Sequence, residues 1–208
     1  MQIILLRSFS IILALFFVQV FYGSSLKIEY LSANSMNNNQ WQEVGDLWIV
    51  SFFDIYKNLP LSRIDSDIHG ENNDALFEWL KRLFCKDQAL ALRDSHVFTL
   101  AYKNERLIGY TLHHVLAQSL IIHIHHFAVD PDTQGQGVGK ALLSAIIKNH
   151  PKIESIVLTT RILNVPAQKF YEHQGFYEIP KLDNVKFDPF YSILLKKDVK
   201  DRGIPASI

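Results

Sequence analysis

The chain has 208 residues, enough for about one domain with a substantial core. Hydrophobic residues make up 48% and charged residues 20%, a balance typical of globular proteins. The 21 basic side chains equal the 21 acidic ones, so the composition excludes a nucleic-acid-binding surface and a polybasic membrane patch. Cys85 is the one cysteine and cannot form an internal disulfide. We expect it to be a small buried helix residue rather than a nucleophile.

The first 25 residues differ from the rest of the chain. Arg7 precedes an apolar run from residue 11 to residue 22, and small residues follow at 23–25. This order is typical of a secretory signal cleaved after Ser25. The run is short for a membrane anchor, which needs about 20 apolar residues, but residues 3–6 bring it nearer to that length. A start codon further downstream is the third reading. The protein is expected to be cytoplasmic if this segment is not translated, and exported or membrane-anchored if it is a working signal.

A single domain is predicted over residues 26–200, followed by a loose tail at 201–208. Runs of β-branched and aromatic residues predict strands, and apolar residues at helical spacing predict helices. The clearest strands are expected at 27–31, 97–102, 107–115, 121–129, 153–160 and 190–195. Helices are expected to begin near Asn37–Asn39 and Asn73, and to cover about 138–149 and 165–173. We predict an α/β chain with a mixed sheet, in the order β-α-α-β-β-β-α-β-α-β-β.

The most informative stretch joins the strand at 121–129 to the helix that begins near Val138. Asp130-Pro131-Asp132 ends the strand, and Gln134-Gly135-Gln136-Gly137-Val138-Gly139-Lys140 leads into the helix. The first N–H groups of a helix have no partner inside it and lie at the positive end of its dipole. With almost no side chains around them, they are predicted to bind an anion such as phosphate.

Spacing excludes two familiar phosphate loops. A dinucleotide-binding fingerprint needs a glycine where Lys140 stands, and a Walker A loop needs a glycine at position 134 and Ser or Thr at position 141. The remaining pattern, Gln-x-x-Gly-x-Gly after a strand that ends in Val-Asp-Pro, resembles the pyrophosphate loop of GNAT acyl-CoA N-acyltransferases. A glycine-rich turn with no ligand is the alternative for the glycines taken alone.

A second block strengthens this resemblance. Residues 164–176 follow the pattern Asn-x-x-Ala-x-x-Phe-Tyr-x-x-x-Gly-Phe, which is similar to the second conserved block of GNAT enzymes and lies at the expected distance from the first. Together the two blocks extend the likeness over roughly residues 27–197. It implies a twisted mixed sheet whose fourth and fifth strands, here about 121–129 and 153–160, splay apart to admit the pantetheine arm of the cofactor.

The resemblance also implies residue roles for binding acetyl-CoA. Main-chain groups of Phe127, Ala128 and Val129 would pair with the pantetheine arm. The pyrophosphate would bind the amides of the cradle, which comprises Gln134, Gly135, Gln136, Gly137, Val138, Gly139 and Lys140. Asn164 matches the residue that hydrogen-bonds the cofactor arm; as an N-cap of the following helix it would also have a purely local role.

The implied catalytic residues are Tyr171, His123 and His125. Tyr171 matches the tyrosine beside the cofactor sulfur, where a phenol with a pKa of about 10 would protonate the departing thiolate. His123 and His125 lie two residues apart, and regular alternation would put them on one face of the strand and His126 on the other. The run His-x-His-x-x-Ala-Val is similar to that of serotonin (arylalkylamine) N-acetyltransferase, where such a pair relays the proton of the amine. The alternative is that the tyrosine and the histidines are packing residues; His113 and His114 are expected to be structural.

The sequence thus predicts an N-acetyltransferase that transfers an acetyl group from acetyl-CoA to a primary amine by direct attack. Cys85 lies far from both motifs, which disfavours an acyl-enzyme. No metal site is predicted, because His123 and His125 lack a nearby acidic or cysteine ligand. The alternative is a non-catalytic acyl-CoA-binding sensor or exported protein. The acceptor is a small-molecule or protein amine, expected to bind near residues 41–63 and 180–189. Membrane contact is expected only through residues 1–25, if they are retained; the oligomeric state stays open.

Overall fold

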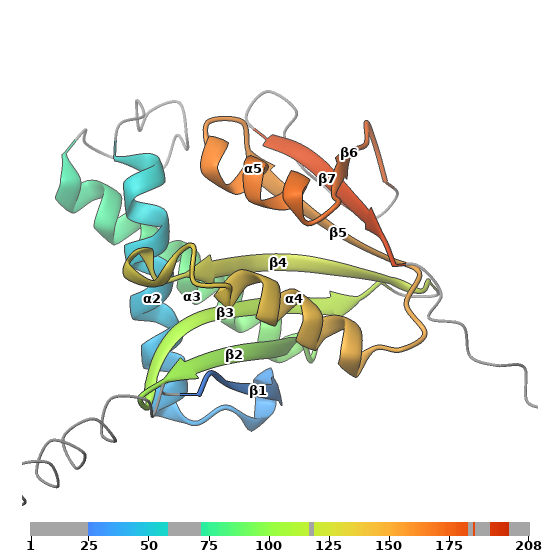
Figure 1. The fold of residues 1–208 in the computed structure, drawn as a ribbon. Helices are drawn as coiled ribbons and strands as arrows, with labels where there is room; N and C mark the ends of the chain where they lie inside the picture. Colours follow the sequence, from blue (N-terminus) through green and yellow to red (C-terminus); the bar gives the residue numbers. More distant parts are fainter. Residues whose placement is uncertain (1–24, 58–71, 117–118, 183–184, 186–191, 200–208) are drawn as a thin grey trace, which may run out of the picture.

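A computed structural model describes residues 25–57, 72–116, 119–182, 185 and 192–199. In this part of the chain the strands form one seven-stranded sheet with the order β1-β2-β3-β4-β5-β7-β6 (Figure 1). The strands are β1 (Lys27–Ser32), β2 (Val97–Lys103), β3 (Arg106–Val115), β4 (Ile121–Val129), β5 (Ser155–Arg161), β6 (Tyr177–Glu178) and β7 (Ser192–Asp198). The helices are α2 (Asn38–Tyr56), α3 (Asn73–Arg93), α4 (Val138–Asn149) and α5 (Val165–His173). The predicted order of strands and helices is confirmed.

The pairing between β4 and β5 is parallel and short. It covers only Ile121–Ile124 against Ser155–Leu158, although the two strands continue to Val129 and Arg161. The other neighbouring pairs in the sheet are antiparallel. Beyond Ile124 the two strands diverge, so the predicted splay of the fourth and fifth strands is confirmed (Figure 1).

Helices cover both faces of the sheet and bury separate cores. On one face, α2 and α3 pack over β1 to β4, and Trp48, Leu80 and Tyr110 are among the residues buried there. On the other face, α4 and α5 pack over β4, β5 and β7, with Ile124, Ile146 and Tyr171 in the buried cluster. The site at the divergence of β4 and β5 is therefore bordered by helices from both layers (Figure 1).

Local signals position the ends of the helices. Asn37 caps α2 by accepting a hydrogen bond from the N–H of Gln40, and the side chain of Gln40 accepts one from the N–H of Asn37. Asn72 caps α3 in the same way through the N–H of Ala75. After α5, Gly175 adopts a φ of 82°, which is the left-handed conformation expected of a residue that follows a helix.

The structure corrects two details of the prediction. The strand expected from residue 153 begins at Ser155, because Ile153 belongs to the turn that leads into it. Cys85 is exposed, not buried. It lies on the outward side of α3, away from the inward stripe that contains Leu76 and Leu80.

Several expectations fall on residues that the structure does not describe. They concern the leader-like segment except Ser25, the tail at 201–208, and the parts of the two acceptor regions at 58–63, 183–184 and 186–189. Within the described ranges, no helix combines the length and the hydropathy needed to cross a membrane.

Candidate active site

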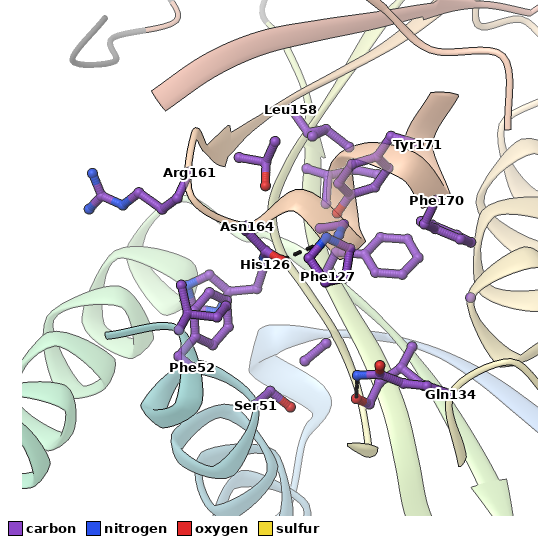
Figure 2. A pocket seen from close by; sticks show the side chains of 18 of the residues that line it. Ser51, Phe52, His126, Phe127, Gln134, Leu158, Arg161, Asn164, Phe170 and Tyr171 are labelled. Atoms are coloured by element: carbon purple, nitrogen blue, oxygen red, sulfur yellow. Dashed lines mark hydrogen bonds between the residues drawn. The ribbon is translucent and has the colours of Figure 1, made fainter. Parts of the chain in front are cut away.

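A cavity of about 1480 Å³ opens where β4 and β5 diverge. Its walls come from α2 and α3 on one side, from α5 on the other, and from the turn between β4 and α4 at one end. Figure 2 shows Phe127, Leu158 and Tyr171 on one side of this space and Phe52 and His126 on another. One continuous cavity therefore connects the glycine turn with the aromatic side chains of α2.

The three glycines of the turn have two different roles. Gly135 and Gly137 have φ values of 75° and 84°, and a Cβ atom at either would meet nothing within 4 Å. A side chain would strain the backbone there and project into the open space. A Cβ on Gly139 would instead lie 2.8 Å from the ring of Phe170. Two glycines thus shape an open turn, and the third lets α5 pack closely on α4.

The turn is fixed by its own side chains. Asp130 is buried, accepts a hydrogen bond of 2.9 Å from the N–H of Asp132, and forms an ion pair with Arg106. Gln134 donates to the main-chain oxygen of Val129 at 3.4 Å, and Gln136 donates to that of Asp132 at 3.2 Å. Both glutamine side chains therefore brace the turn. The groups that could bind an anion are other main-chain amides of the turn, because those of Gln134 and Gln136 donate to Pro131 and Thr133, together with the exposed side chain of Lys140 at the cavity wall.

The ion pair of Asp130 with Arg106 was not predicted from sequence. The pattern predicts Asp130 only as the end of a strand, and Arg106 lies 24 positions before it. The sequence pattern does not show that the carboxylate of Asp130, directly before Pro131, is buried.

The main chain of β4 offers a free edge to the cavity. Phe127, Ala128 and Val129 pair with β3 on one side, but the ladder with β5 ends at Ile124. All three residues line the cavity. An extended ligand could therefore pair with β4 in place of a neighbouring strand, as the resemblance to GNAT enzymes implies for the pantetheine arm.

A β-bulge in β4 changes the direction of its histidines. Leu112 pairs with His126 and His113 pairs with Ile124, so His125 is the extra residue of the bulge. His125 contacts His114, and His126 contacts Trp48, which places both rings on the side of the sheet covered by α2 and α3. The prediction that His126 faces the opposite side is wrong, because the bulge interrupts the alternation on which it relied.

His123 and His125 belong to a cluster of neutral imidazoles. Their ring centroids are 4.3 Å apart, and Nε2 of His125 lies 2.8 Å from Nδ1 of His114. Burial lowers the pKa of His125 to about 2 and that of His123 to about 4, and neighbouring histidines add to both shifts. His125 lines the cavity. His114, which we expected to be structural, is its direct hydrogen-bonding neighbour. His113 lies on the opposite face, against Tyr30 and His150.

The same cluster contains the best metal-ligating group among the described residues. His96, His114 and His125 each offer a ring nitrogen within 4.8 Å of the others. The sequence does not indicate this group, because His96 and His114 are distant in the chain from His123 and His125. The three rings stack with interplanar angles of 9° to 23°, and one pair of nitrogens is already hydrogen-bonded. Stacked rings do not aim their lone pairs at one point, so this arrangement suits a hydrogen-bonded chain better than a metal ion.

Tyr171 lies at the fork of the sheet. Its side chain is 6% exposed, and its ring packs edge-on against Phe127, Phe170 and Phe176. Burial raises the pKa of the phenol well above 10, so the hydroxyl carries its proton at neutral pH. Tyr171 lines the cavity, as a proton donor to a bound ligand must.

Asn164 caps α5 and also borders the cavity. Its side-chain oxygen accepts a hydrogen bond of 3.3 Å from the N–H of Ala167, which confirms the local role expected from sequence. Because only one oxygen lone pair is needed for the cap, the amide can also contact a ligand. The cofactor contact stays a prediction.

The fold and this cavity define a class: proteins with a splayed mixed sheet and an anion-binding turn at its fork. The family model described as "Acetyltransferase (GNAT) family" matches residues 51–176, more than half of the chain. The chain therefore belongs to the GNAT acetyltransferase family, and its resemblance to that family is confirmed.

Individual proteins also resemble the chain. It is 26% identical over 123 residues to the [ribosomal protein bS18]-alanine N-acetyltransferase of Escherichia coli (strain K12), and the matched stretch covers 58% of this chain and 79% of that protein. The PaiA N-acetyltransferase of Thermoplasma acidophilum, solved in complex with coenzyme A, matches 84% of this chain and 99% of that one, with a TM-score of 0.61 and 18% identity. The structure of the Escherichia coli ribosomal-protein-S18-alanine N-acetyltransferase matches 88% and 100%, with a TM-score of 0.51 and 18% identity. Both structural matches show the shared fold.

Proposed function

We propose that this protein transfers an acetyl group from acetyl-CoA to a primary amine by direct attack on the thioester. One observation supports this most strongly. A single cavity runs from the anion-binding turn, along the free edge of β4 and past the hydroxyl-bearing Tyr171, to the aromatic side chains of α2. A thioester and an amine can meet in such a cavity without a covalent enzyme intermediate, and exposed Cys85 does not line it.

The cofactor would bind mainly to main-chain groups. Its pyrophosphate would bind the amides of the turn from Gln134 to Lys140, with the Lys140 ammonium adding positive charge. Its pantetheine arm would pair with the free edge at Phe127–Val129, and Asn164 would hydrogen-bond the arm from the opposite wall. This arrangement would place the thioester at the fork between β4 and α5.

The reaction requires three proton movements. The bound ammonium group first loses a proton, since only the neutral amine has a lone pair for attack. The nitrogen bonds to the carbonyl carbon, the carbon–sulfur bond breaks, and Tyr171 gives its proton to the thiolate. The nitrogen then loses a second proton, and one of the two lost protons restores Tyr171. The balance is one amide, one thiol and one proton released to solvent.

His125 would accept the first proton and pass it on. Its low pKa makes it a poor store for a proton, but its Nε2 is hydrogen-bonded to His114 and its ring contacts His123. A proton taken from the cavity can therefore leave through the cluster. Amides near Phe127–Val129 would stabilise the charge that develops on the carbonyl oxygen.

Replacing Tyr171 with Phe tests the proposal, because it removes the hydroxyl and keeps the packing. With the full-length protein and a panel of amines, we expect kcat to fall about 100-fold, since general acid catalysis contributes factors of this order. The dissociation constant for acetyl-CoA, measured by calorimetry, should stay within about twofold, because the pyrophosphate and pantetheine contacts are unchanged. The panel includes a peptide with an N-terminal alanine, since one relative is named as an alanine N-acetyltransferase of a ribosomal protein.

The same measurements address the alternative, a non-catalytic acyl-CoA-binding protein. Micromolar acetyl-CoA binding without turnover of any amine would favour that alternative. Unchanged turnover in Tyr171→Phe would remove the tyrosine from the mechanism while leaving the transfer reaction in place.

A further inference from the structure

We call the part of the cavity lined by α2, α3 and His126 the acceptor half, and the part lined by the glycine turn, α4 and α5 the cofactor half. The acceptor half contains a carboxylate–imidazole pair that the sequence did not indicate. Oδ2 of Asp87, on α3, lies 2.9 Å from Nε2 of His126, on β4. The His126 side chain is only 8% exposed, whereas that of Asp87 is 30% exposed, and both residues line the cavity. The carboxylate is thus the part of the pair that a ligand can reach.

Hydrogen bonds at both ring nitrogens hold this pair in place. Nδ1 of His126 lies 3.3 Å from the hydroxyl of Tyr110, which is fully buried. An N–H at Nε2 donates to the Asp87 carboxylate. The imidazole thus orients the carboxylate at the cavity wall.

The other charged side chains of the cavity wall are one carboxylate and three cations. Asp54 is paired with Lys57 at 2.7 Å, and both side chains are largely exposed. Arg161 donates to the hydroxyl of Tyr56 at 3.1 Å and to that of Ser192 at 3.3 Å, so hydrogen bonds hold its guanidinium at the end of α2. Lys140 and Lys169 belong to α4 and α5 on the cofactor side. Asp87 therefore supplies a partly exposed carboxylate to the acceptor half.

Aromatic rings and free polar atoms surround the same place. Trp48 and Phe52 stack on each other at 4.9 Å and lie 5.8 Å and 6.4 Å from the ring of His126. Figure 2 shows Phe52 beside His126. Within the described residues, the buried Nε1 of Trp48 and Oγ of Ser51 have no hydrogen-bond partner, although both residues line the cavity. Buried polar atoms without partners are unusual in a folded protein.

We infer that the acceptor is a cationic alkyl amine with an aromatic or apolar body, and that Asp87 binds its ammonium group. This inference rests on the proposed acetyl transfer. The carboxylate would pair with the ammonium, Trp48 and Phe52 would pack on the apolar body, and their ring faces favour a nearby cation. His126 is a positioning residue, which orients the carboxylate through its N–H. The bulge places His125 next to His126 on the same face of β4, so the ammonium would be captured beside the residue that takes its proton.

The test compares two acceptors of similar shape in steady-state kinetics of the full-length protein. Phenylethylamine is a cation at pH 7, and aniline has the same ring but is neutral. In Asp87→Asn we expect the KM for phenylethylamine to rise about tenfold or more, as loss of one partly buried charge pair implies, with kcat changed less than about threefold. The KM for aniline and the dissociation constant for acetyl-CoA should not change.

Asp54→Asn is the matched control, since it removes another carboxylate of the cavity wall that is exposed and already paired. Its KM for phenylethylamine should change less than about twofold. His126→Gln keeps an N–H donor toward Asp87 and should preserve KM better than His126→Leu, which has none.

The outcomes separate this inference from the proposed function. Acetylation of phenylethylamine with equal KM values in wild type and Asp87→Asn would overturn the inference and leave acetyl transfer intact. Acetylation of aniline or of the alanine peptide, but not of the alkyl amine, would also overturn it. Failure of all acceptors, despite acetyl-CoA binding, would refute the proposed function itself.

Discussion

The two halves of the cavity are built in different ways. The half that we propose for the cofactor comes largely from one continuous stretch, Phe127–Lys140, and the groups it offers a ligand are main-chain amides and the free edge of β4. The acceptor half combines side chains from α2, α3 and β4, which lie up to about 80 positions apart in the chain. Its geometry depends on a bulge, on stacked rings and on one hydrogen-bonded carboxylate.

This difference predicts how each half responds to substitution. The cofactor half should tolerate changes of its side chains but not of its backbone conformation, since φ values and not side-chain chemistry define it. The acceptor half should keep its backbone and lose specificity when single side chains change. Substitutions in each half therefore test this contrast.

The largest effect is expected from Gly137→Val. Gly137 has a φ of 84°, which a β-branched residue adopts only at a cost of about 1–3 kcal/mol. The turn should reorganise and its amides should point away from the pyrophosphate, so we expect acetyl-CoA to bind about 10- to 100-fold more weakly in calorimetry. Gly137→Asn is the matched control, because asparagine tolerates this conformation better. Equal affinities for the valine and asparagine variants would mean that the backbone conformation does not define the site.

A smaller effect is expected from replacing His123 and His125 together with glutamine. Without the relay, only the fraction of amine that is already neutral in solution can react, so we expect kcat to fall about tenfold or more near pH 7. At pH values below the pKa of the amine, the rate of the variant should rise about tenfold per pH unit. The wild-type rate should instead become independent of pH in the lower part of that range. His150→Gln, on the other face of the sheet, should keep the wild-type profile. A double variant with that same profile would make both histidines packing residues.

A third prediction concerns stability in acid and not activity. Burial lowers the pKa of His113 to about 3, and His123 and His125 are shifted in the same direction. As the pH falls below about 6.5, the unfolded chain binds protons that the folded chain does not. The free energy of unfolding is therefore unaffected by these histidines above pH 6.5. It decreases from pH 6.5 toward pH 4, by up to about 1.4 kcal/mol per pH unit for each histidine.

Denaturant unfolding at several pH values measures this slope. His113→Gln should make it shallower by up to about 1.4 kcal/mol per pH unit, whereas exchange of the exposed His173 should leave it unchanged. A wild-type stability that is flat between pH 6.5 and 4 would show that these rings accept protons without cost in the folded state.

The cofactor half was predictable from sequence because its determinants are local. Alternating glycines after a strand, and an asparagine before a helix, define conformations over a few residues, and the structure has them where the pattern indicated. The order of strands and helices follows from hydrophobic periodicity in the same way.

The acceptor half could not be predicted, because its determinants are long-range. The bulge at His125 arises from the pairing of β4 with β3 and reverses the expected face of His126. Asp87 lies on a helix 39 positions before its partner, and nothing in its neighbourhood distinguishes it from a solvated charge. The predicted burial of Cys85 is wrong for a related reason. Leu83 and Phe84, directly before it, favour a wider buried stripe on α3 than the packing gives.

The short ladder between β4 and β5 has a consequence for the mechanical integrity of the protein. Four residue pairs join the half-sheet of β1 to β4 to that of β5, β7 and β6. A coenzyme in the fork would touch both halves and act as an additional strand across the seam. At 100 times its dissociation constant, a ligand that binds only the folded state adds about 2.7 kcal/mol of stability. Amide hydrogens of β5 and β7 should then exchange more slowly, so the substrate would also hold the two arms of its own binding site together.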